Sequence, residues 1–196
     1  MTDNGRAPWV IEPAEPDSPE AATILRLYPA EMISRYYCCP TDDAEIDRHL
    51  ADGHGSDDLT APTGLLLLAR QHGEVVGCVG LRRLGLQTLE LTRMFVRPDV
   101  RGAGCATRLL CSAEVAAREL GARVVRLTTR KDLVEAHALY AKHGYAEIPP
   151  YIDAPLVDHC FEKKLDRTSS GVRAGKRSAH SPRAAVRARP SRSASC

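Results

Sequence analysis

The chain has 196 residues, of which 43% are hydrophobic, and this is enough for one globular domain with a buried core. Its longest apolar run, Leu65 to Ala69, is too short for a transmembrane helix, and residues 1–10 lack the basic start and apolar stretch of a signal peptide. We therefore expect a cytoplasmic protein with no membrane partner. The seven cysteines form no Cys-x-x-Cys pair and no histidine cluster accompanies them, so no metal is expected.

Charge divides the chain into two segments. Residues 166–196 contain eight Lys or Arg and one Asp, a formal charge of +7, which leaves −5 for residues 1–165 of the overall +2. The basic segment has no apolar periodicity, so we predict a disordered tail that follows one folded domain, residues 1–165. This tail is either a dispensable solvated extension or an arm for a polyanion. Its lack of aromatic residues argues against nucleic acid as a partner.

The first part of the domain predicts a strand and two helices. Trp9–Pro13 is a candidate strand, and Ser18 followed by Pro19 is typical of a helix start. Pro29 is expected to interrupt this first helix. Residues 41–43 begin a second helix that runs to about residue 50, and residues 51–63 form a polar, Gly-rich loop.

The remainder predicts three strands, then alternating helices and strands. The strands are residues 64–70, 74–82 and 88–97, and Gln71-His72-Gly73 indicates a hairpin between the first two. A helix over residues 102–120 follows from its apolar period and from Gly121 at its end. A strand at 124–129, a helix at 133–143 with Asp132 as N-cap, and strands at 145–148 and 157–165 complete the series. This order predicts an α/β fold with one mixed sheet and helices on both faces.

The segment Phe95-Val-Arg-Pro-Asp-Val-Arg-Gly-Ala-Gly-Cys-Ala106 carries the most information about function. A strand ends there and a Gly-rich turn opens a helix, so backbone N–H groups and the helix dipole converge on one point. Such a site suits a phosphate or pyrophosphate, and Arg101 adds a charged contact. The turn alone is also compatible with an incidental anion site.

Two motifs in this sequence resemble the GNAT superfamily of N-acetyltransferases. Arg101-Gly-Ala-Gly-Cys-Ala106 is similar to its acetyl-CoA pyrophosphate motif, and Ala138-Leu-Tyr-Ala-Lys-His-Gly-Tyr145 is similar to the end of a second motif. The order of elements over residues 9–165 is also similar. The resemblance implies a mostly antiparallel sheet that splays between its fourth and fifth strands, with acetyl-CoA as cosubstrate lying in the splay. The implied cofactor-binding residues are Met94, Phe95, Val96, Arg101, Gly102, Ala103, Gly104, Cys105, Ala106 and Thr107. Where the family often has Asn, this chain has Thr128 and Thr129.

The resemblance also implies two catalytic residues. Glu90 matches the position of a general base in some members, where it takes the amine proton directly or through water. Tyr140 matches the tyrosine that protonates the departing CoA thiolate, since a phenol is protonated at neutral pH. Each residue also has a structural interpretation: Glu90 as an ion-paired strand residue beside Arg93, and Tyr140 as a packed helix residue.

The acceptor is less well defined by the sequence. We expect Arg93 to bind a substrate carboxylate, and Tyr28 and Tyr151 to lie near the acceptor. The function expected from the resemblance is direct transfer of an acetyl group to a primary amine of a small molecule in a ternary complex. Protein acetylation on lysine or an N-terminus, a non-catalytic acyl-CoA-binding module with a polyanion-binding tail, and a homodimer remain alternatives or additions.

Overall fold

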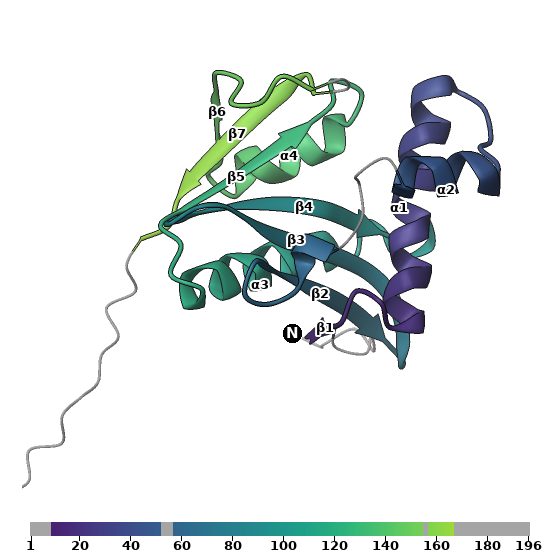
Figure 1. Ribbon diagram of the computed structural model, residues 1–196, viewed down its shortest axis with the longest axis horizontal. Coiled ribbons are helices and arrows are strands. Elements are labelled where there is room, and N and C mark those ends of the chain that lie inside the picture. The colour runs from purple at the N-terminus through teal and green to yellow at the C-terminus, as the bar shows by residue number, and fades with distance from the viewer. Residues whose placement is uncertain (1–8, 52–56, 155–156, 167–196) are drawn as a thin grey trace, which may run out of the picture.

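The computed structural model describes residues 9–51, 57–154 and 157–166 (Figure 1). The tail predicted from residue 166 onward therefore lies outside the described residues, except for Asp166. The described chain forms one seven-stranded sheet with the strand order β1-β2-β3-β4-β5-β7-β6 and helices on both of its faces. The predicted α/β architecture is thus confirmed. No helix in the described ranges is long and apolar enough to cross a membrane.

The N-terminal elements follow the sequence with one correction. Strand β1 covers Val10–Ala14, helix α1 covers Pro19–Tyr37, and helix α2 covers Asp43–Ala51. Ser18 caps α1 by accepting a hydrogen bond from the N–H of Ala21. The expected interruption at Pro29 is wrong: α1 is continuous through it, and Pro29 is among the fully buried residues. Burial against the sheet offsets the lost backbone hydrogen bond.

The central strands form antiparallel hairpins. Strands β2 (Gly64–Gln71), β3 (Glu74–Gly85) and β4 (Thr88–Val96) follow a short 3-10 helix at Asp57–Leu59. Between β3 and β4, Gly80 pairs with Thr92 but Cys78 pairs with Phe95, so β4 contains one extra residue there. Arg93 lies in this bulge with φ of 52°. A bulge re-aims the residues that follow it, and here it brings Met94 and Phe95 to the sheet centre in a new register.

The C-terminal half closes the fold. A short 3-10 helix (Pro98–Val100) leads into helix α3 (Cys105–Glu119), and strand β5 (Val124–Thr129), helix α4 (Val134–Lys142), strand β6 (Ala146–Ile148) and strand β7 (His159–Lys164) follow. Helix α3 begins three residues later than predicted, because Gly102 and Gly104 have positive φ. Asp132 does not cap α4; its carboxylate binds Arg130 instead.

The sheet separates two layers and opens between β4 and β5. One core cluster packs α3 against the sheet through residues such as Leu109 and Leu127, and a smaller cluster packs α1 through Ile24 and Leu25. Strands β4 and β5 pair in parallel over four residue pairs and stop at Leu91 and Leu127. Beyond this point the two strands diverge, and α1 stands beside the open end (Figure 1).

Candidate functional site

A pocket of about 570 Å³ lies where β4 and β5 diverge. Its wall comes from α1, the second half of β4, the segment that leads into α3, the end of β5, and α4. Strand β5 pairs with β4 only as far as Leu91. After Leu91, the edge of β4 that is not paired with β3 therefore borders this pocket instead of another strand. An elongated ligand can therefore pair with β4 inside the sheet.

One end of the pocket has features that suit an anion. Gly102 and Gly104 have φ of 73° and 91°, and they turn the chain so that α3 begins at the pocket wall. A Cβ at either position would meet no atom within 4 Å, so it is the backbone conformation that favours glycine here. The first N–H groups of α3 have no partner within the helix and carry its positive dipole end. Arg101 lies beside them and donates from Nε to the carbonyl of Val96 at 2.8 Å.

The structure brings together nearly all the residues expected to bind the cofactor. Of that set only Ala103 is outside the wall; the residues that line it are Met94, Phe95, Val96, Arg101, Gly102, Gly104, Cys105, Ala106 and Thr107. Thr128 and Thr129 also line it. The hydroxyl of Thr129 is buried and lacks a hydrogen-bond partner among the described residues. An unpaired buried hydroxyl at this place suits an amide-bearing ligand arm such as pantetheine.

Tyr140 lies in the pocket wall on α4, and 5% of its surface is exposed. Burial raises the pKa of its phenol above the usual value, and nearby Tyr28 adds to the rise. The hydroxyl therefore stays protonated across the neutral range. A protonated phenol at this position can donate a proton to a departing group.

Glu90 is placed differently from the other candidate catalytic residue. It is 3% exposed and is not part of the pocket wall. Its carboxylate accepts from Nε of Arg82, which lies directly opposite on β3, and from the hydroxyl of Tyr151 at 2.7 Å. The expected pairing with Arg93 is thus replaced by a cross-strand pair with Arg82. Burial and the adjacent Glu90 carboxylate raise the pKa of Tyr151.

The acceptor candidates are divided between the pocket and its surroundings. Arg93 and Tyr28 both line the pocket, and the Arg93 guanidinium lies 5.6 Å from the centroid of the Tyr28 ring. Burial raises the pKa of Tyr28. Tyr151 is not in the wall; its ring lies under the guanidinium of Arg126, 5.3 Å away. Arg93 combines a strained backbone with a place in the pocket, a combination that is frequent at functional sites.

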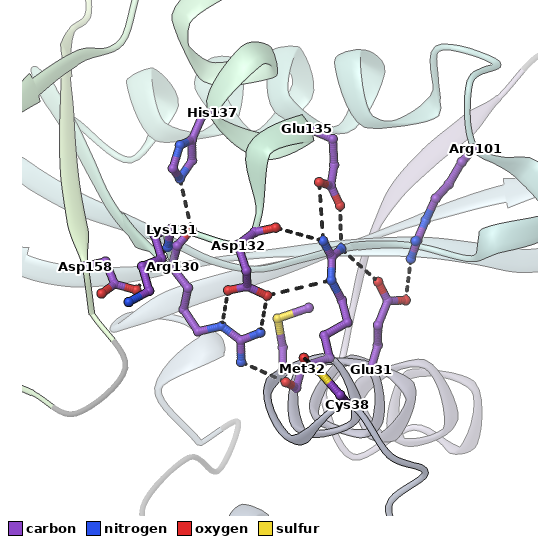
Figure 2. A network of polar contacts seen from close by, with 11 residues as sticks. Glu31, Met32, Cys38, Arg101, Arg130, Lys131, Asp132, Glu135, His137 and Asp158 are labelled. Carbon is purple, nitrogen blue, oxygen red and sulfur yellow. Dashed lines mark hydrogen bonds and ion pairs between the residues drawn. The ribbon is translucent and has the colours of Figure 1, made fainter.

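A network of ion pairs joins α1 to both sides of the pocket, and sequence reasoning did not find it (Figure 2). Glu31 accepts from Arg101, and Arg35 binds Glu135 of α4. The network continues along the α1 side through Arg130, which donates to the carbonyl of Met32 at 2.7 Å and to Asp132. The pairs that join α1 to the rest of the chain left no sequence signal, because their partners are 70 to 100 residues apart.

The structure also shows the state of the cysteines and whether potential metal ligands lie together. Within the described ranges no group of three or more His, Cys, Asp or Glu side chains could hold a metal ion. The six described cysteines are free, and Cys78, Cys105 and Cys160 among them are buried.

Comparison with known proteins places this site in a family. The acetyltransferase (GNAT) family model matches residues 24–145. An IAA acetyltransferase of Azospirillum brasilense is 34% identical over 119 residues, which cover 55% of this chain and 76% of that protein. An aminoalkylphosphonate N-acetyltransferase of Salmonella typhimurium is 34% identical over 85 residues, covering 41% and 55%. The PaiA N-acetyltransferase of Thermoplasma acidophilum, solved with coenzyme A, superposes with a TM-score of 0.60 at 17% identity over 80% of this chain and 99% of that one. The chain belongs to the GNAT family of N-acetyltransferases.

Proposed function

We propose that the enzyme transfers an acetyl group from acetyl-CoA to a primary amine of a small molecule, directly and in a ternary complex. The single observation that supports this most is the pocket that runs from the N-terminus of α3, between β4 and β5, to Tyr140. The pyrophosphate would bind Arg101 and the N–H groups of Gly102 to Thr107. The pantetheine arm would pair with Met94 to Val96 and reach the unpaired hydroxyl of Thr129.

Acetyl transfer forms a C–N bond and breaks a C–S bond, so the oxyanion and the departing thiolate both need support. A backbone N–H group near Phe95 or Val96, in the part of β4 that follows the bulge, can donate to the oxyanion. Tyr140 donates its phenolic proton to the CoA sulfur as the C–S bond breaks. The buried, protonated state of this phenol supports that role.

The amine must also lose a proton, and Glu90 is the general base that receives it without touching the amine. Because Glu90 lies outside the pocket wall, the proton would pass through water and Tyr151, whose hydroxyl already donates to Glu90. Glu90→Gln then lowers kcat and removes the acidic limb of its pH profile. A parallel drop at every pH would instead assign Glu90 to a purely structural ion pair with Arg82.

The acceptor in this proposal is a small amine that also carries an anionic group. Arg93 and Tyr28 supply a cation and a phenol to the pocket, and the cation suits the anionic group of the acceptor. The name of the Salmonella relative, an aminoalkylphosphonate N-acetyltransferase, describes an acceptor of this kind. A cytoplasmic location and a homodimer remain predictions alongside it.

The test is release of free CoA thiol from acetyl-CoA in the presence of single amines. The panel contains aminoalkylphosphonates, amino acids, uncharged alkylamines and a lysine-bearing peptide. The proposal expects the highest kcat/KM with the anionic small amines and a loss of that preference in Arg93→Gln. Turnover with the peptide alone would favour protein acetylation, and no saturable binding of acetyl-CoA would overturn the proposal.

A further inference from the structure

The side chain that should bind the cofactor pyrophosphate already has a carboxylate bound to it. Nη2 of Arg101 donates to Oε2 of Glu31, an ion pair that joins α1 to the loop before α3 (Figure 2). The Glu31 side chain is 18% exposed and that of Arg101 is 39% exposed, so the pair lies at the pocket mouth rather than free in solvent. Both residues line the pocket.

A second cation already pairs with the same carboxylate. Nη1 of Arg35 lies 3.6 Å from Oε1 of Glu31, one helical turn along α1. Arg35 is itself fixed by Glu135 and by the carbonyl of Asp132, to which it donates at 3.0 Å. Glu31 can therefore release Arg101 and keep Arg35 as its partner, without moving α1.

A bound pyrophosphate changes the balance between these two partners. It brings negative charge to the start of α3, next to Arg101, and like charges at such short range repel. The pyrophosphate offers Arg101 a bidentate, doubly charged partner, whereas Glu31 is a single carboxylate. We infer that Glu31 is an internal ligand of Arg101 that the cofactor pyrophosphate must displace, so that the carboxylate is left with Arg35 alone when acetyl-CoA binds.

This inference rests on the proposed cofactor site. It predicts that a substitution of Glu31 changes cofactor affinity in the opposite direction to a substitution of a residue that binds the cofactor. Removing the charge of Glu31 leaves Arg101 without a competitor, so cofactor affinity rises instead of falling.

The experiment is isothermal titration of the full chain with CoA at low and at high salt. We expect Glu31→Gln to tighten CoA binding about fivefold at low salt, with a smaller gain at high salt because salt screens the pair. Asp99→Asn is the matched control. It removes one carboxylate from the segment before α3 that also contains Arg101. Asp99, however, binds Arg97 and is not in the pocket wall. Equal tightening in Asp99→Asn would mean that only the general charge of this region matters, and would overturn the inference.

Two further titrations separate the possible failures. In Arg101→Gln, the added change Glu31→Gln should give at most a small gain, since the pair is already broken. Dephospho-CoA, which keeps the pyrophosphate but lacks the 3′-phosphate, should gain as much from Glu31→Gln as CoA does. If the unmodified chain binds CoA but Glu31→Gln binds it equally or more weakly, the inference fails alone. If the unmodified chain does not bind CoA, the proposed function fails.

Discussion

The hydroxyl of Tyr151 donates a 2.7 Å hydrogen bond to Oε1 of Glu90, which lies 61 residues earlier in the chain. This contact attaches the loop after β6 to the middle of the sheet. It also gives the carboxylate of Glu90, a residue that is 3% exposed, a second side-chain donor besides Arg82. A buried carboxylate that loses one of its donors is destabilised, because the desolvation penalty remains.

Tyr151→Phe should therefore lower the free energy of unfolding by about 1.5–3 kcal/mol, the size typical of a hydrogen bond to a charged group. Urea unfolding at pH 7 measures this. Tyr37→Phe is the control, because Tyr37 is 60% exposed and its hydroxyl should contribute little. An unchanged midpoint in Tyr151→Phe would mean that water replaces the phenol at Glu90.

Alkaline pH should destabilise the enzyme through its buried phenols. Burial is the largest cause of the raised pKa in each of four tyrosines: Tyr28, Tyr140, Tyr145 and Tyr151. The unfolded phenol titrates near pH 10, so above that pH the unfolded state binds fewer protons than the folded state. The free energy of unfolding should thus be unaffected by these groups below pH 9 and should fall above pH 10. The expected slope is about 1.4 kcal/mol per pH unit for each tyrosine.

Urea unfolding from pH 8 to 11 tests this, with phenolate absorbance followed in parallel. Tyr151→Phe should show a shallower decline than the unmodified chain, because one of the four groups is gone. A steep loss of stability that begins near pH 8 would contradict the assignment to tyrosines.

Arg101→Ala should weaken CoA binding about tenfold, because a charge-assisted contact to the pyrophosphate is lost. Thermal melting with increasing CoA measures the effect, since a ligand that binds only the folded state raises the melting temperature by mass action. Arg97→Ala is the matched control: Arg97 binds Asp99 and lies outside the pocket wall. A similar loss in both variants would place the anion site nearer to Arg97.

Tyr140→Phe should reduce kcat about a hundredfold near pH 7 and leave the affinity for CoA almost unchanged. The hydroxyl acts on the departing thiolate and not on the bound cofactor, so the effect is confined to the chemical step. Tyr145→Phe is the control, a buried tyrosine whose ring centroid is 5.7 Å from that of Tyr140 but which does not line the pocket. Thiol release under saturating acetyl-CoA gives kcat for each variant. A Tyr140→Phe enzyme with normal kcat would remove the proposed acid.

Local pattern predicted most of the fold. The strand at Val124–Thr129 has the predicted bounds, and the Ser18-Pro19 start and the Gly121 end of their helices were correct because capping chemistry is local. The continuity of α1 through Pro29 could not be predicted, since burial against the sheet decides it. Asp132 shows the same limit: its side chain binds Arg130, and a cap prediction from spacing does not include such competitors.

The site was predictable where it depends on backbone and not where it depends on pairing. The residues that the resemblance implied for the cofactor line the pocket except Ala103, and glycine at 102 and 104 permits the positive φ that the turn has there. The partner of Glu90 was missed because the hairpin register, which sets Arg82 opposite it, is not encoded in a short motif. Glu31 and Arg101 are 70 residues apart, and only the folded chain joins them.

Strands β4 and β5 are joined by four residue pairs, and this short ladder affects which parts of the sheet unfold together. Beyond Leu91 and Leu127, no backbone ladder joins the first four strands to β5, β7 and β6 (within the described chain). Amide hydrogens on the two sides should therefore exchange with solvent as two cooperative units, each with its own opening free energy. A cofactor that pairs with β4 and also contacts α4 would merge these units, so that protection would rise on both sides of the seam at once.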